Sequence, residues 1–147
     1  MTKIATATFI AALVFSLAAQ AKGDQGATVR IKFKNARSAK GVVRCTLYNS
    51  KEGFPTKPRK AMRRTFATIK GARATCTFEN LPRGVYAVAA YHDEDNNNEM
   101  KSNFLGIPRE GTAATNNAEG TFGPPSFKDA SFRLGATGFE QTVKLDY

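Results

Sequence analysis

The stretch Leu81-Pro82-Arg83-Gly84-Val85-Tyr86-Ala87-Val88-Ala89-Ala90-Tyr91 decides the fold class of this chain of 147 residues. Pro82 and Gly84 predict a turn, because proline presets one backbone angle and glycine accepts conformations that other residues avoid. Residues 85–91 are apolar on both faces of an extended chain. This pattern predicts the central strand of a sheet that is covered on both sides.

Shorter strand patterns surround this central one. Residues 28–34 alternate between apolar and charged side chains, which is typical of a strand with one buried face. Further strands are predicted over 42–48, 64–70, 72–78, 130–134 and 139–145, with frequent turns and no convincing amphipathic helix. We therefore expect an all-β fold, an antiparallel β-sandwich of about seven strands with one long ordered loop. The Leu-Pro-x-Gly turn before an apolar strand also resembles the transthyretin-like (prealbumin-like) and immunoglobulin-like sandwich modules.

The first 21 residues have the layout of a secretory signal peptide. Lys3 supplies a positive charge, residues 4–19 are apolar, and Ala19-Gln20-Ala21 is a small-x-small cleavage site. A membrane anchor is the alternative, but the apolar run is short for a bilayer span of about 20 residues. We expect cleavage near Ala21, a periplasmic or secreted location, and one domain over residues 22–147 with its core at about 28–146. No other stretch is apolar enough to span a membrane.

The chain is strongly basic, with a formal net charge of +10. Loss of Lys3 with the signal peptide leaves about +9, which favours attraction to anionic envelope polymers, phospholipid headgroups or acidic envelope proteins. Nucleic acid is a less available partner for an exported protein. The densest basic patch is either a docking site or an ordinary solvated surface, and it consists of Lys57, Arg59, Lys60, Arg63 and Arg64.

The two cysteines, Cys45 and Cys76, predict a disulfide. An even number of cysteines in an oxidising compartment favours pairing, and both residues fall on the apolar sides of their predicted strands. The bridge closes a loop of about 30 residues and is worth roughly 3–4 kcal/mol by loop entropy. Use of two isolated cysteines in metal binding or catalysis is the less favoured alternative.

Four motifs carry a resemblance to a known family. They are Tyr91-His92-Asp93-Glu94-Asp95, Phe104-Leu105-Gly106-Ile107-Pro108-Arg109-Glu110-Gly111, Asn116-Asn117, and Gly123-Pro124-Pro125-Ser126-Phe127-Lys128-Asp129-Ala130. With them the chain, from about residue 29 to 145, resembles domain of unknown function 2141, a family of exported bacterial proteins. The resemblance implies export and a sandwich fold, and it implies no established activity.

The acidic turn that follows the central strand is a candidate Ca²⁺ site. Asp93, Asp95 and Asn97 place oxygen atoms at alternate positions, which suits a cation that takes six to eight oxygen ligands. Lys101 stands where the family has a closing Asp, and Phe104 stands at the twelfth position in place of a bidentate Glu. The alternative is a polar turn in which Asp and Asn side chains bind backbone amides and Lys101 pairs with Asp93 or Asp95.

The long stretch over residues 100–127 is expected to be a functional flap, because loops beyond about 12–15 residues are uncommon in compact domains. Five apolar residues are expected to anchor it over a sheet edge, and these are Phe104, Leu105, Ile107, Phe122 and Phe127. The candidates for lining a shallow ligand pocket in or beside it are His92, Glu110, Thr115, Asn116 and Asn117. The alternative is a flap that only covers an edge strand.

These features favour an exported binding or envelope-associated module whose partner is an anionic envelope polymer or another envelope protein. One alternative is a small periplasmic hydrolase that uses His92 as a base with Asp93 or Glu110, although no nucleophile motif accompanies the histidine. A packed histidine at a strand end explains the same residue. The other alternative is an accessory protein that binds Ca²⁺ weakly.

Overall fold

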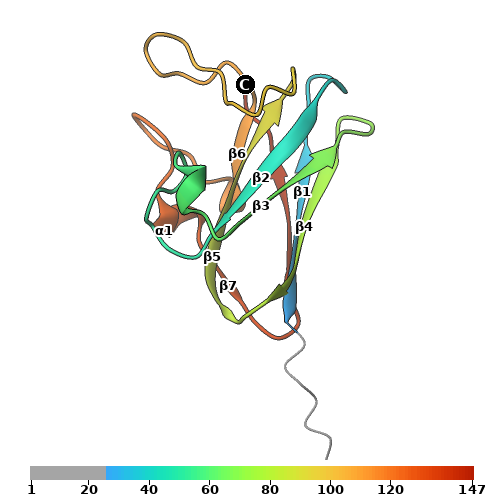
Figure 1. The fold of residues 1–147 in the computed structure, drawn as a ribbon, viewed down its shortest axis with the longest axis vertical. Coiled ribbons are helices and arrows are strands. Elements are labelled where there is room, and N and C mark those ends of the chain that lie inside the picture. Colours follow the sequence, from blue (N-terminus) through green and yellow to red (C-terminus); the bar gives the residue numbers. More distant parts are fainter. Residues whose placement is uncertain (1–25) are drawn as a thin grey trace, which may run out of the picture.

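The computed structural model describes residues 26–147, so the predicted signal peptide lies outside the described residues. The described chain is mostly strand, with one short α-helix and two 3-10 helices (Figure 1). The strands are β1 (Ala27–Lys34), β2 (Val42–Tyr48), β3 (Arg63–Thr68), β4 (Ala74–Leu81), β5 (Gly84–Asp93), β6 (Thr112–Ala114), β7 (Phe132–Leu134) and β8 (Phe139–Lys144). The helical segments are η1 (Pro58–Lys60), η2 (Thr115–Asn117) and α1 (Phe127–Ala130).

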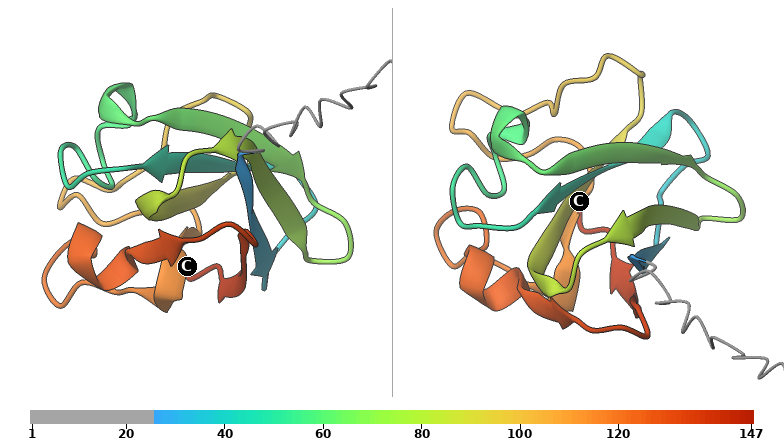
Figure 2. Two further views of the ribbon diagram at one scale, coloured as in Figure 1. Left: turned by 90° about the horizontal axis from the view of Figure 1, so that it is seen from below. Right: turned by 60° about the horizontal axis from the view of Figure 1, so that its bottom comes forward.

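Two sheets form the expected all-β sandwich, and Figure 2 shows them from two further directions. The smaller sheet has the order β4-β1-β8, and the larger has the order β3-β2-β5-β6, with β7 paired to the first part of β5. Neighbouring strands are antiparallel except β8, which lies parallel to β1. This parallel direction arises because the chain changes sheets before β8. Strand β7 pairs with β5 in the larger sheet, and the turn of residues 135–138 then leads into the smaller sheet.

The main core lies between the two sheets and consists of the alternate side chains that the sequence pattern assigns to the interior. Val29, Ile31 and Phe33 of β1 are buried, while Arg30 and Lys32 point outward and pair with Glu140 of β8. This alternation follows from the two-residue period of a strand. One face of β1 is thus apolar and the other is charged.

The predicted disulfide is present and joins the two sheets. Cys45 on β2 and Cys76 on β4 are bonded with a sulfur–sulfur distance of 1.98 Å, and their Cα atoms are 6.5 Å apart. Both residues are buried in the main core. Because β2 and β4 belong to different sheets, the bridge is a covalent link across the sandwich.

The outer face of the larger sheet is covered by a second, smaller core. Ala87 of β5 packs there with Ala114 and Ala130, against the partly buried rings of Phe54 and Phe127. The two rings meet edge to face with centroids 5.7 Å apart, a geometry that aromatic pairs prefer. The first half of β5 is therefore covered on both faces, as the sequence predicts.

The stretch expected to be a packed flap behaves differently from the prediction. Residues 112–114 form β6 on the edge of β5, which makes an eighth strand, and α1 closes the stretch. Of the five predicted anchors only Phe127 packs on the body of the domain. The prediction is wrong for the other four, whose exposed fractions are 96% for Phe104, 69% for Leu105, 56% for Ile107 and 102% for Phe122.

No helix within residues 26–147 combines the length and the apolar character that crossing a bilayer would require.

Candidate functional site

The acidic turn begins where β5 leaves the sheet, and Asp93 organises it. The side chain of Asp93 is fully buried and accepts hydrogen bonds from the amides of Asn97 and Asn98, each at 3.1 Å. It also forms an ion pair with Arg44 on the neighbouring strand β2. Asn96 and Asn98 take positive φ angles of 57° and 65°, which asparagine tolerates better than most residues. The turn is therefore closed by a buried carboxylate that caps its own backbone.

Glu110 connects this turn to the base of the following loop. Its carboxylate is buried and accepts one bond from the amide of Glu94 at 3.2 Å and one from the amide of Lys101 at 3.0 Å. These two amides lie on either side of the acidic turn. Glu110 thus holds the start and the end of the turn in one position, and the turn in turn fixes where the loop leaves the domain.

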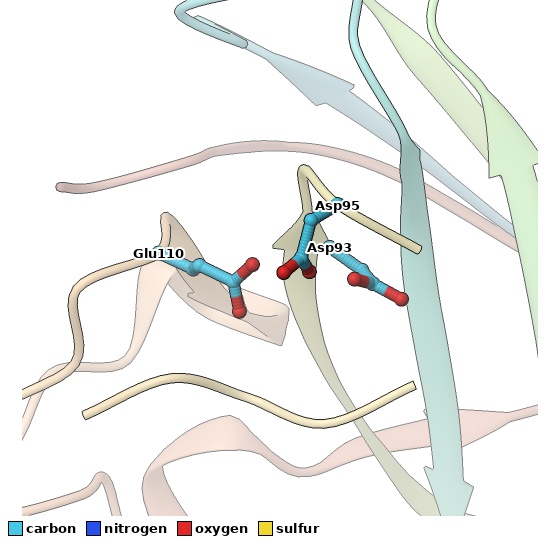
Figure 3. A group of neighbouring side chains, drawn as sticks. All are labelled: Asp93, Asp95 and Glu110. Atoms are coloured by element: carbon cyan, nitrogen blue, oxygen red, sulfur yellow. The ribbon is translucent and has the colours of Figure 1, made fainter. Parts of the chain in front are cut away.

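Three carboxylates come together at this point, as Figure 3 shows for Asp93, Asp95 and Glu110. One oxygen from each lies within 4.8 Å of the others. Asn97, the third predicted ligand, instead donates to Asp95 at 3.3 Å and accepts from the amide of Glu99 at 2.8 Å. The structure therefore groups two of the three predicted ligands with Glu110.

The surroundings of this group fit a Ca²⁺ ion poorly. Lys101 forms an ion pair with Asp95, and Arg44 forms one with Asp93, so two cations already neutralise the carboxylates that a metal would need. The hydrogen bond from Lys101 lowers the pKa of Asp95 below its ordinary value. These contacts match a polar, hydrogen-bonded turn better than a cation site, and such a turn is the alternative that the sequence also predicts.

A shallow pocket of about 220 Å³ lies beside the turn, lined by Arg37, Glu94, Asp95, Lys101, Arg109 and Glu110. Its charges are mostly paired, because Arg37 contacts Glu94 at 2.5 Å in addition to the pair between Lys101 and Asp95. Burial acts to raise the pKa of Glu94, but the hydrogen bond and the positive charge of Arg37 outweigh it and lower that pKa. The pocket offers three cations and three carboxylates, so it has no strong preference for a ligand of either sign.

His92 lies on the opposite face of β5 from Asp93 and is fully buried. Its Nε2 atom is 2.7 Å from the carbonyl oxygen of Lys40, which can only accept, so Nε2 carries the proton. Its Nδ1 atom accepts from the hydroxyl of Tyr147 at 2.7 Å, and the same hydroxyl accepts from the amide of Arg37 at 3.0 Å. Both ring nitrogens thus have structural partners, which matches the interpretation of a packed histidine at a strand end.

The remaining predicted pocket residues bind the chain itself. Thr115 is buried and bridges Val88 of β5 and Ala130 of α1 through its hydroxyl, at 3.1 Å and 2.5 Å. Asn116 donates to two carbonyl groups near α1, and Asn117 accepts from the amide of Lys144 at 2.9 Å. These three residues dock η2 onto β5, α1 and β8, and they do not line the pocket that contains Glu110.

The basic patch is exposed throughout, as expected for either of its two interpretations. Lys57, Arg59 and Lys60 lie at η1, and Arg63 and Arg64 open β3. A shallow depression of about 430 Å³ adjoins it, lined by Arg63, Arg64, Thr65, Thr77, Phe78, Glu79 and Asn80. The depression lies between β3 and the second half of β4, which are edge strands of the two different sheets, so sequence spacing alone does not predict it.

Comparison with known protein families matches residues 31–142 to the family described as "Uncharacterized protein conserved in bacteria (DUF2141)". The chain belongs to this family. The matched region contains the acidic turn and the basic patch. Comparisons with curated proteins and with solved structures gave no match.

Proposed function

We propose that the protein is an exported binding module that attaches to anionic polymer of the cell envelope through its basic patch. The single observation that carries the proposal is the uncompensated charge of this patch. Among the described residues only Lys60 of the five has a carboxylate partner, Glu52 at 3.2 Å. Arg63 donates to a backbone carbonyl, that of Glu79, and therefore keeps its full charge.

The geometry of the patch suits oxyanions. Arg63 and Arg64 line the 430 Å³ depression, where two guanidinium groups outnumber the single carboxylate of Glu79. Neutral hydrogen-bond donors are added there by Thr65, Thr77 and Asn80. Guanidinium groups present pairs of donors that match phosphate or carboxylate oxygens. A flexible polymer that carries such groups can follow the patch from η1 along β3. The other charged pocket, beside the acidic turn, is internally paired and offers no comparable excess of charge.

Binding of long-chain polyphosphate to the protein without residues 1–21 tests the proposal. The triple variant Lys57→Gln/Arg59→Gln/Arg64→Gln removes three patch cations that have no carboxylate partner among the described residues. We expect its dissociation constant to rise by about tenfold or more at low salt, and the affinity of the unmodified protein to fall steeply as salt is added. Titration by fluorescence anisotropy or calorimetry measures both effects.

A matched control separates the patch from net charge. The triple variant Lys34→Gln/Lys70→Gln/Arg73→Gln removes the same formal charge from exposed positions, two of which lie in the turn between β3 and β4. It should lose much less affinity than the patch variant. Equal losses in the two triples, or the absence of polyanion binding at low salt, would contradict the proposal.

A further inference from the structure

Two loops present large apolar side chains to solvent at their tips. The first holds Phe104, Leu105 and Ile107, and the second holds Phe122, whose side chain is as exposed as in a free peptide. Apolar groups gathered in this way on a folded protein mark an interaction site more often than chance exposure does. The bodies of both loops are polar, so the apolar character is confined to the tips.

The first loop is a preorganised hairpin. Phe104-Leu105-Gly106 forms a three-residue connection in which Gly106 takes a φ of 78°, and its amide donates to the carbonyl of Asn103 at 2.9 Å. Ser102 and Pro108 pair across the stem, and the amide of Arg109 donates to the carbonyl of Lys101 at 2.8 Å. The tip is thus held out from the domain by its own hydrogen bonds.

Most backbone amides of this tip are satisfied within the loop. The side chain of Asn103 accepts from the amides of Leu105 and Ile107, at 2.9 Å and 3.0 Å, and the amide of Asn103 donates to the carbonyl of Ile107 at 2.8 Å. Pro108 has no amide proton to satisfy. Because unpaired backbone groups are what makes irregular chain costly in an apolar medium, these internal bonds reduce the cost of moving the tip out of water.

Positive charge lies at the base of the first loop and in the basic patch. Arg109 at the base of the first loop is exposed and has no carboxylate partner among the described residues. In the views of Figures 1 and 2, the gold loop with residues 101–109, the orange loop with residues 119–126 and the green coil of η1 all lie toward the same side of the molecule. Apolar tips above a cationic base match the layering of an anionic bilayer, with acyl chains inside and anionic headgroups outside.

We propose that these two loops insert Phe104, Leu105, Ile107 and Phe122 into the interfacial region of an anionic phospholipid bilayer. The inference deepens the proposed function and rests on it for the attraction of the basic patch to an anionic surface. A bilayer is favoured over a second copy of this chain, because the apolar groups sit on separate protruding tips and a charge of about +9 on residues 22–147 opposes self-association.

A single tryptophan reports insertion directly, since the chain contains none. We expect the emission of a Phe104→Trp variant to shift to shorter wavelength, and to be quenched by brominated acyl chains, when vesicles of phosphatidylcholine with phosphatidylglycerol are added. Val85→Trp is the matched control, because Val85 is also partly exposed but lies at the far end of β5 from the acidic turn. Its emission should not change.

Sedimentation with the same vesicles measures the contribution of the tips to affinity. The Phe104→Ser/Leu105→Ser variant should partition at least about tenfold less, because burial of one such side chain already changes a partition constant by about that factor. A Val85→Ser variant should partition like the unmodified protein. Both tip residues are exposed, so circular dichroism should report an unchanged fold for each variant.

Two results would overturn insertion: an unshifted Phe104→Trp spectrum on vesicles that bind the protein, or a dimer that depends on Phe104 in the absence of lipid. An equal shift with vesicles of phosphatidylcholine alone would overturn the assignment of an anionic bilayer as the partner. The polyphosphate experiment tests the basic patch independently of these results. Binding of polyphosphate that depends on the patch, combined with either of the first two results, would leave the proposed function standing and reject the insertion of the loops.

Discussion

His92 and Asp93 are neighbours in the chain, yet β-strand alternation sends their side chains to opposite faces of β5. Asp93 turns toward Arg44 and caps the acidic turn, whereas His92 turns inward between Lys40 and Tyr147. The two residues are therefore not a catalytic pair in this fold. Each serves a different connection at the same end of the sandwich.

His92 is predicted to contribute to stability. A His92→Ala change removes two hydrogen bonds of 2.7 Å and leaves the carbonyl of Lys40 without its partner, so the free energy of unfolding should fall by about 2–4 kcal/mol. Denaturant unfolding measures the loss. A Tyr147→Phe variant removes one of these bonds together with the bond from the amide of Arg37 to the same hydroxyl, but it keeps the bond to the carbonyl of Lys40, so it should lose less, about 1–2 kcal/mol. A His92→Ala protein as stable as the parent would refute a structural role.

At the scale of the element, the acidic turn is a junction that two carboxylates build from opposite sides. Asp93 holds the turn from the end of β5, and Glu110 holds it from the start of the chain segment that leads into β6. The hairpin of residues 101–109 lies between these two residues in the chain. The two carboxylates thus position the loop, which gives the acidic residues of this turn a structural role in a basic protein.

The turn is predicted not to respond to Ca²⁺. Lys101 and Arg44 already pair with Asp95 and Asp93, so millimolar CaCl₂ should leave the thermal midpoint where NaCl of equal ionic strength leaves it. Differential scanning fluorimetry makes the comparison. A Lys101→Gln variant, in which Asp95 loses its partner, is the sensitised control. A rise of the midpoint that is specific to Ca²⁺ in the unmodified protein would restore the metal interpretation.

At the scale of the whole molecule, two sheets enclose one main core, and charge is kept on the outside. The Cys45–Cys76 disulfide ties the sheets together and contributes roughly 3–4 kcal/mol by the loop-entropy argument. Ion pairs such as Arg37–Glu94 and Lys32–Glu140 lie on the surface. Pairs as exposed as these contribute little individually, but together they set how stability varies with pH.

Stability should rise from acid toward neutral pH. Arg37 lowers the pKa of Glu94 against the effect of burial, and Lys32 and Arg30 lower that of Glu140, so the unfolded chain binds more protons at low pH. This stabilisation is present above the ordinary carboxyl pKa of about 4 and is lost as pH falls below it.

Unfolding midpoints measured from about pH 3 to about pH 7, a range that spans the carboxyl pKa values, test how stability depends on pH. An Arg37→Gln variant should show a flatter acid limb than an Arg73→Gln control. On the alkaline side, burial raises the pKa of Tyr48 to about 12, so stability should decline above about pH 10, where tyrosines of the unfolded chain ionise. A midpoint that does not change between pH 3 and 7 would contradict the assignment.

Much of the fold could be predicted because strand periodicity is a local property. The alternation in residues 28–34, the apolar run of 85–91 and the sides on which the two cysteines fall all describe single strands, and the structure confirms them. Strand β6 was not predicted, because three residues with small side chains are too few to show an alternating pattern. They are extended because they pair with the edge of β5. The parallel pairing of β8 with β1 depends on the crossing between sheets, which no local pattern encodes.

By itself the sequence determined the sandwich, the disulfide pair and the locations of the acidic turn and the basic patch, since each depends on residue type and short spacing. Only the tertiary structure decided what the polar and apolar residues of the loops do. In the tertiary structure Glu110, and not Asn97, groups with Asp93 and Asp95. Both ring nitrogens of His92 are hydrogen-bonded, and Phe104 and Phe122 are exposed to solvent. The physical reason is that an apolar side chain is buried only where the fold supplies a surface to cover it, and a carboxylate finds its partner only when distant segments meet.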